Sequence, residues 1–223
     1  GLFIVGLNRS SPVDASIIAT AVPIFVLLLA AVILKEPITR KKSFGVFMGV
    51  SGGLLLVFSS THAIDSISSL DGDMMMIVSG LMYAIYLVLS KPLSLRYSSV
   101  TMMKWMFLFT TLTLVPFTFR HVLDAPAFHR ETLDFVELGA IFYVLFGATF
   151  LPYLLIPMSL KRIRPTTVSM YNYVQPIVAS FIAVMIGQDT LSWQKVLSAV
   201  LVFTGVYLVT QSKSREDMEK GKR

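Results

Sequence analysis

The side chains best suited to recognise a ligand lie within a long apolar stretch around residue 172. Ser169, Asn172 and Gln175 recur at every third position and are followed by Pro176. In a helix this spacing places the three side chains on one side, and two amides are costly to bury among apolar groups without hydrogen-bond partners. The pattern predicts a site that binds a polar group of a small molecule. The alternative is an Asn/Gln network that only fixes contacts between helices.

A second polar stripe lies earlier in the chain. Ser79, Tyr83, Tyr86 and Ser90 follow the i, i+4, i+7, i+11 spacing of one helical face. Hydroxyl groups are unfavourable against hydrocarbon, so we expect this face to line a cavity, where Ser79, Tyr83 and Tyr86 would contact a substrate. Interhelical hydrogen bonds and an aromatic belt at a membrane interface are the alternatives.

One basic residue lies inside an apolar run. Lys104 stands beside Trp105, and the simpler interpretation is that its ammonium snorkels to the interface. The alternative makes both residues part of a site for an anionic substrate. The acidic residues fall at the ends of apolar runs, and we interpret Glu36 and Asp189 as bend and capping residues. This pattern does not support proton coupling through a buried carboxylate.

The residue types needed for catalysis or metal binding are missing or badly spaced. The chain has no cysteine, and its histidines, His62, His121 and His129, lack metal-ligand spacing. The sequence has no phosphate loop or HExxH motif. We therefore expect no catalytic residue, no metal and no cofactor, and predict that the protein is not an enzyme.

Composition sets the class of protein. Of 223 residues, 55% are hydrophobic and 14% charged, with a mean hydropathy of +0.73, whereas soluble domains are about 25% charged. Runs long enough to cross a bilayer span about 12–34, 43–60, 73–90, 100–119, 138–159, 166–187 and 193–211. The fold class is therefore an all-α polytopic membrane protein. A net charge of +6 does not indicate nucleic acid, because the basic residues lie in the connections between runs.

The distribution of lysine and arginine predicts the orientation. Fourteen of the 19 basic residues fall in the connections 35–42, 91–99 and 160–165 and in the tail 212–223. Short connections rich in these residues stay on the cytoplasmic side. We expect the C-terminus in the cytoplasm and the long loop 120–137 outside.

An internal repeat is the most informative feature of the sequence. Shifting the chain by 153 residues aligns 7–57 with 160–210 without a gap and matches eleven identical pairs, including Pro12 with Pro165 and Pro23 with Pro176. The equivalent runs are five apart, so the two copies must have opposite orientations in the membrane. Inverted repeats of this kind are typical of secondary transporters.

The repeat also predicts the organisation of the chain. We expect the end of a first repeat at 1–60, an external linker at 61–72, a five-helix second repeat at 73–211 and a charged tail at 212–223. The first copy shows only the equivalents of the last two helices of the second copy. The sequence is therefore interpreted as seven spans of an expected ten, from an N-terminally incomplete protein. Pro23 and Pro176 are expected at hinges, and Gly45, Gly49 and Gly53 form a small-residue groove for packing within a bundle or between protomers.

These features resemble the EamA-like family of the drug/metabolite transporter superfamily. The resemblance covers nearly the whole chain and is carried by a proline helix, an acidic bend and a Gly-rich helix in each copy: Pro23, Glu36 and 45–56, then Pro176, Asp189 and Gly205 with Leu208. It implies two inverted repeats of five helices, usually in a bacterial inner membrane, moving amino acids, metabolites, nucleotide-linked compounds or toxic cations. The chain departs from the pattern in lacking the first helices and in having Asp189 where Glu is more common.

The sequence as a whole predicts an inverted-repeat helical bundle that acts as a small-metabolite permease by alternating access. The expected partners are membrane lipid and an unidentified small-molecule substrate, with no nucleic acid, and a homodimer is the alternative to a monomer. A seven-helix receptor or channel and a non-functional transporter fragment are the alternatives. A membrane-embedded enzyme is disfavoured because the runs hold no cluster of His, Asp or Glu.

Overall fold

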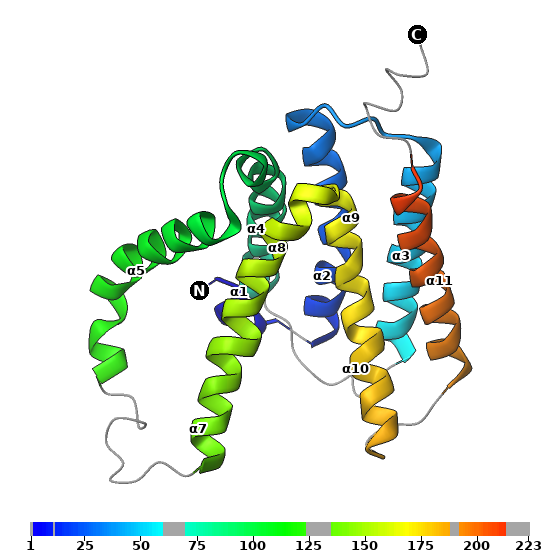
Figure 1. Ribbon diagram of the computed structural model, residues 1–223. Coiled ribbons are helices and arrows are strands. Elements are labelled where there is room, and N and C mark those ends of the chain that lie inside the picture. Colours follow the sequence, from blue (N-terminus) through cyan, green and yellow to red (C-terminus); the bar gives the residue numbers. More distant parts are fainter. Residues whose placement is uncertain (1, 11, 60–69, 124–134, 188–191, 213–223) are drawn as a thin grey trace. The chain divides into compact units, whose positions relative to one another are not determined.

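The computed structural model describes residues 2–10, 12–59, 70–123, 135–187 and 192–212. Within these ranges every regular element is helical (Figure 1). The elements in chain order are α1 (Leu2–Leu7), α2 (Pro12–Ile33), α3 (Arg40–Ser59), α4 (Leu70–Arg96), α5 (Ser99–Leu123), α7 (Phe135–Phe142), the π-helical segment η1 (Tyr143–Phe150), α8 (Leu151–Arg162), α9 (Pro165–Met170), the 3-10 turn η2 (Tyr171–Tyr173), α10 (Val174–Met185) and α11 (Trp193–Thr210). The all-α fold class is confirmed.

Seven helical stretches are long and apolar enough to cross a membrane, and they match the seven predicted runs. They are Asp14–Ile33, Arg40–Phe58, Leu70–Arg96, Ser99–Thr118, Phe135–Arg162, Pro165–Met185 and Trp193–Thr210. The largest differences are at α4 and at the α7–η1–α8 stretch, which both continue to a basic residue past the predicted end. Helix α4 begins at Leu70, inside the predicted linker 61–72; positions 60–69 and most of the predicted tail lie outside the described residues.

The described chain forms two compact units, Gly1–Leu89 with Ile163–Arg223 and Ser90–Arg162. In the first unit, α3 and α11 make the most extensive contact between any two described elements. Buried residues from α2, α3, α9, η2 and α11 form its core: Leu27, Val46, Met170, Tyr173, Val202, Val206 and Val209. This unit holds most of the residues singled out from the sequence.

Glycines bring α3 and α11 together at backbone distance. An ideal Cβ on Gly45 would lie 2.8 Å from the Gly205 carbonyl oxygen, and one on Gly52 would lie 2.9 Å from the Ser198 carbonyl oxygen. Moving forward along α3 from Gly45 to Gly52 moves the contact backward along α11 from Gly205 to Ser198, so the two helices run antiparallel. The shift of 153 carries Gly45 to Ser198 and Gly52 to Gly205, so each contact is the image of the other.

Equivalent helix ends in the two copies are built alike. The Thr39 hydroxyl accepts from the backbone N–H of Lys42 at 3.2 Å, and the Ser192 hydroxyl accepts from that of Lys195 at 3.4 Å. Thr39 and Ser192 are related by the shift, and both act as N-caps. Before Thr39 the chain turns at Lys35, which has a φ of 53°, and the Glu36 N–H donates back to the Ala30 carbonyl at 3.1 Å.

The second unit consists of the end of α4, α5 and the α7–η1–α8 stretch. Helices α5 and α8 meet through Phe107 and Tyr153, whose ring centroids lie 5.4 Å apart, and the Lys91 ammonium donates to the Leu160 carbonyl at 2.5 Å. In η1 the Thr149 hydroxyl donates to the carbonyl five residues earlier, Val144, at 2.8 Å. Such widened turns accommodate a nearby proline, here Pro152, which cannot donate a backbone hydrogen bond.

Candidate functional site

The predicted ligand-binding residues lie where a helix changes type. The segment α9–η2–α10 carries Ser169, Asn172, Gln175 and Pro176, and it is interrupted by the 3-10 turn Tyr171–Tyr173. Pro176 cannot donate to the carbonyl of Asn172, and its ring crowds that carbonyl. The break therefore falls one turn before Pro176, and the hinge role of Pro176 stays a prediction. The equivalent Pro23 is fully buried within the unbroken helix α2.

The three predicted polar residues are neighbours but have different surroundings. Ser169 is fully buried, and its hydroxyl donates to the Thr166 carbonyl at 2.9 Å, so it is used within the helix. Asn172 is partly buried and Gln175 is exposed. Ser169 thus supports the turn, and the role of the Asn172 and Gln175 amides in binding a ligand stays a prediction.

A residue that the sequence interpretation missed joins this segment to α2. The Tyr173 hydroxyl donates to the Thr20 carbonyl at 2.5 Å, and Tyr173 is 4% exposed. Thr20 and Tyr173 are separated by 153 residues, so each is the repeat partner of the other. A residue that contacts its own repeat partner lies on the axis relating the two copies. Because the pair is Thr and Tyr, no identity in the alignment marked it.

An ion pair with a fully buried lysine lies where α9 packs against the bend between α2 and α3. The Lys42 ammonium lies 2.5 Å from the Glu36 carboxylate, and Lys42 is fully buried. The Thr166 hydroxyl donates to the same carboxylate oxygen at 3.4 Å, which ties α9 to the bend between α2 and α3. Glu36 lies at this bend, as predicted. Lys42, which the charge count treated as a loop residue, is instead part of the packed end of the helices.

Arg164 connects the same region to the end of α11. One guanidinium nitrogen donates to the Val209 carbonyl at 3.0 Å and to the Ser212 carbonyl at 2.8 Å. A cation at the last carbonyls of a helix is favourable because these groups lack intrahelical partners and the helix dipole is negative there. Arg164 therefore fixes where α9 begins relative to the end of α11.

The predicted stripe on α4 is present on one face. Ser79, Tyr83 and Tyr86 are partly buried, and the two tyrosine rings lie 6.1 Å apart between centroids. Ser90 is 5% exposed. The contact of Ser79, Tyr83 and Tyr86 with a substrate stays a prediction.

Lys104 and Trp105 belong to the second unit. Both are exposed; the Lys104 ammonium lies 5.9 Å from the Trp105 ring centroid, and Trp105 stacks on Phe109 at 5.6 Å. An exposed cation over an exposed indole at a span end fits the snorkelling interpretation. Their role in binding an anionic substrate stays a prediction.

The small-residue groove is filled by helices of the same unit. Cβ positions on Gly45, Gly49 and Gly53 would meet α11, Met170 with Tyr173, and Thr20 with Tyr173, respectively. The packing of Gly45, Gly49 and Gly53 is thus within the bundle. In the described part of the chain no three His, Cys, Asp or Glu residues gather as a metal site would require, and Asp189 lies outside it.

These features define the class of the protein. The described chain is an integral membrane protein with seven apolar helices, and the first unit contains a polar helix that is broken before a proline. The model of the EamA-like transporter family matches residues 1–58 and 70–211. The chain belongs to that family, so the resemblance read from the sequence is confirmed, and the protein is a membrane transporter by family.

Curated relatives agree with this assignment. The chain is 27% identical to an uncharacterized transporter of Archaeoglobus fulgidus, over 92% of this chain and 68% of the relative. It is 26% identical to the uncharacterized transporter YyaM of Bacillus subtilis, over 92% and 66%. A Salmonella typhimurium protein named as a probable amino-acid metabolite efflux pump is 24% identical, over 87% and 66%. The chain spans about two thirds of the length of these relatives.

A solved structure supports the fold. A crystal structure superimposes with a TM-score of 0.76 at 17% identity, covering 94% of this chain and 70% of that one. The similarity concerns the arrangement of the helices and carries no information about substrate.

Proposed function

We propose that the protein is a permease that moves a small polar metabolite across the membrane by alternating access between two inverted repeats. The observation that carries the proposal is the set of contacts related by the 153-residue shift. Thr20 meets its own partner Tyr173, and the Gly45–Gly205 contact is the image of the Gly52–Ser198 contact. Antiparallel helices related in this way support an axis in the membrane plane, as in transporters built from inverted repeats.

The substrate site is assigned to the broken helix α9–η2–α10. Broken helices carry the substrate sites of such transporters because irregular backbone and side-chain amides are tolerated where they line a cavity. Asn172 and Gln175 offer both donors and acceptors. Their repeat partners, Ala19 and Val22, have no polar side-chain atoms. One polar end of the substrate would therefore be recognised mainly by the second copy.

Amino-acid metabolites are the substrate class to screen first. The Salmonella typhimurium relative is named as an efflux pump for them, and amides can bind both a carboxylate and an ammonium group. We also propose a bacterial inner membrane location, with the C-terminus in the cytoplasm. This orientation follows the excess of lysine and arginine in the connections on that side.

The test of the site uses paired substitutions in the full-length protein. Asn172→Ala and Gln175→Ala should each reduce the transport of the screened substrate by roughly tenfold if one hydrogen bond of about 1.4 kcal/mol is lost. Gln194→Ala is the matched control, because it removes the same side chain as Gln175→Ala at an exposed position on α11. Membrane insertion should be unchanged in all three. Full transport by both site variants would overturn the site assignment.

Orientation and assembly have separate tests. The chain contains no cysteine, so single cysteines at Lys41 and Trp193 can be labelled from either side of the membrane without a background. Labelling of Lys41→Cys from the outside of intact cells would contradict the proposed orientation. A homodimer would have to use a face other than the filled glycine groove, and the mass of the particle in detergent distinguishes a monomer from a dimer.

The alternatives predict different results. A channel would pass substrate without saturation, and a receptor would bind a ligand without moving it. A non-functional fragment would insert into the membrane and transport nothing. Saturable uptake or efflux that is lost in the Asn172 and Gln175 variants supports the permease over all three.

A further inference from the structure

The helix that carries the proposed substrate site is firmly packed before its 3-10 turn and loosely packed after it. Before the turn, α9 buries five of its six residues: Pro165, Thr166, Thr167, Ser169 and Met170. After the turn, none of the described residues of α10 is buried. Tyr173, which ends the turn and is 4% exposed, is therefore the last buried residue of the segment.

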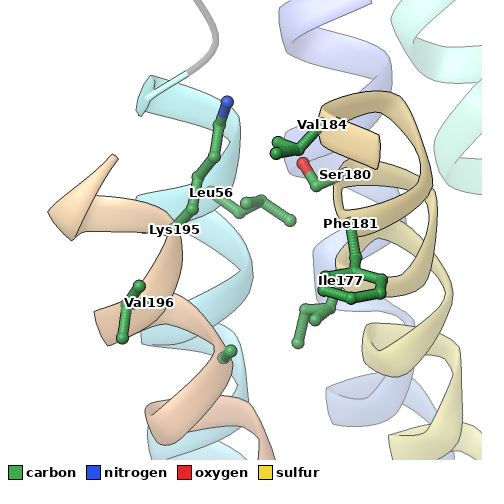
Figure 2. A pocket seen from close by; sticks show the side chains of 8 residues that line it. Leu56, Ile177, Ser180, Phe181, Val184, Lys195 and Val196 are labelled. Carbon is green, nitrogen blue, oxygen red and sulfur yellow. The ribbon is translucent and has the colours of Figure 1, made fainter. Parts of the chain in front are cut away.

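An apolar cavity lies beside α10 just past this residue. Its volume is about 210 Å³, and residues of α3, α10 and α11 line it, including Leu56, Ile177, Phe181 and Lys195. Figure 2 shows Ile177 and Phe181 on the α10 side of the cavity, with Leu56 opposite them. Atoms that face open space lose packing contacts, so the segment is positioned mainly at and before Tyr173.

The Tyr173 ring is held by α3. An ideal Cβ on Gly49 would lie 3.0 Å from the Cε2 atom of the ring, and one on Gly53 would lie 3.3 Å from its Cε1 atom. The two glycines are about one helical turn apart, so opposite edges of the ring rest on successive turns of α3. A larger side chain at either position would push the ring away from the helix.

The Tyr173 hydroxyl holds the turn to α2. It donates to the Thr20 carbonyl at 2.5 Å, and Thr20 is itself 6% exposed. A 3-10 turn has poorer hydrogen-bond geometry than an α-helix, so contacts with other helices decide where its residues lie. Asn172 directly precedes Tyr173 in the chain, and its amide is therefore placed by an anchor on the first copy.

We propose that Tyr173 is a positioning residue of the substrate site. By fixing the 3-10 turn against α2 and α3, Tyr173 sets where the Asn172 amide meets the substrate. This inference rests on the proposed permease function. Tyr173 itself makes no contact with the substrate, because its ring and its hydroxyl are both used within the packed unit.

The first test measures the position of the turn and needs no substrate. The chain has no cysteine, so Asn172→Cys introduces a single thiol whose rate of reaction with a water-soluble maleimide reports the exposure of residue 172. Tyr173→Phe should raise this rate several-fold, whereas the rate at Gln194→Cys, exposed on α11, should stay the same. Equal rates at residue 172 with and without Tyr173→Phe, no reaction in either included, would overturn the proposal.

A second variant disturbs the anchor without removing a polar group. The Cβ of Gly53→Ala would lie 2.9 Å from the Thr20 Cγ2 atom as well as 3.3 Å from the Tyr173 ring, so this variant should also raise the labelling rate at residue 172. It decides the question if Tyr173→Phe does not fold. Gly139→Ala is the matched control, because its methyl group meets no atom within 4 Å. An equal change of rate in Gly53→Ala and Gly139→Ala would contradict the anchor.

The third test separates positioning from general stability in the full-length protein, with radiolabelled L-serine as the probe. Asn172→Ala should raise the half-saturating concentration roughly tenfold. Tyr173→Phe should raise it several-fold at an unchanged maximal rate per folded transporter. Added to Asn172→Ala, Tyr173→Phe should raise it no further, because the amide through which it acts is already gone. An unchanged half-saturating concentration, or the same increase with and without the amide, would indicate a structural role alone and overturn the proposal.

Failure of the proposed function gives a different pattern. No saturable uptake of L-serine by the parent, or an Asn172→Ala variant with the half-saturating concentration of the parent, would contradict the proposed function or its site. The labelling rates would then decide by themselves whether Tyr173 positions the turn, because they need no transport. Unchanged helical circular dichroism and elution volume show that each variant remains folded.

Discussion

Adding one methyl group at Gly205 should force apart the two helices that hold the first unit together. The Cβ of Gly205→Ala would lie 2.6 Å from the Gly45 carbonyl oxygen and 2.7 Å from the Gly49 nitrogen, whereas ordinary contact begins at 3.4 Å. Because both neighbours are backbone atoms, α3 and α11 must separate by about 0.8 Å, and a close-packed interior resists such a movement. Overpacking of this kind costs about 1–3 kcal/mol.

The helix propensity of alanine works in the opposite direction, so the control matters. Alanine is favoured over glycine by about 1 kcal/mol in a helix interior, which leaves Gly205→Ala destabilised by up to about 2 kcal/mol. Gly139→Ala, in α7, meets no atom within 4 Å and should be neutral or stabilising. The stability of Gly49→Ala should lie between those of the other two variants. The atom closest to the new Cβ is the flexible end of the Met170 side chain, at 2.5 Å.

Thermal unfolding of the three variants in detergent, followed by fluorescence-detected size exclusion, measures the order of their stabilities. A loss of about 2 kcal/mol corresponds to a Tm lower by roughly 4–8 °C for a chain of this size. A Gly205→Ala variant with a Tm equal to that of Gly139→Ala would refute the argument, because the α3–α11 interface would then not depend on backbone approach at this residue.

Two further substitutions test the buried contacts, with the same thermal assay. Lys42→Met leaves the Glu36 carboxylate without its cation and should lower the free energy of unfolding by about 3–5 kcal/mol. Adding Glu36→Gln should recover part of that loss. A Lys42→Met variant as stable as the parent would contradict a stabilising ion pair. Tyr173→Phe removes only the hydroxyl that reaches Thr20 and should cost about 1–3 kcal/mol, whereas Tyr153→Phe, at a more exposed tyrosine, should cost little.

The membrane spans were predictable because hydrophobic length alone decides them. Seven apolar runs became seven helical spans, and the prolines within them did not prevent the helices. The repeat was predictable because prolines and glycines have backbone roles that two copies share. The ends of the helices were less predictable: α4 and α8 continue through Arg96 and Arg162, since basic residues can extend a helix into the headgroup region.

The partners of polar groups could not be predicted from spacing. Lys42 was assigned to a loop because charge counting treats lysines as solvent-exposed, whereas the bend at Lys35 brings Glu36 within reach of its ammonium. Ser169, Asn172 and Gln175 were expected to share one environment, but the 3-10 turn before Pro176 changes the helical register. As a result Ser169 is buried and Gln175 is exposed.

The two copies are alike in their backbone contacts and differ in their side chains. The contacts that repeat under the 153-residue shift involve glycines, carbonyl oxygens and cap hydroxyls, which any sequence with small residues at those positions can supply. The differences between the copies are side-chain differences: Thr20 against Tyr173, Ala19 against Asn172, and a buried Lys42 against a cavity-lining Lys195. A shared backbone frame relates the two inverted copies by one axis, while unlike side chains would let one copy carry the proposed ligand chemistry. Substitutions at the shared glycines should therefore change stability, and those at Asn172 and Gln175 should change transport alone.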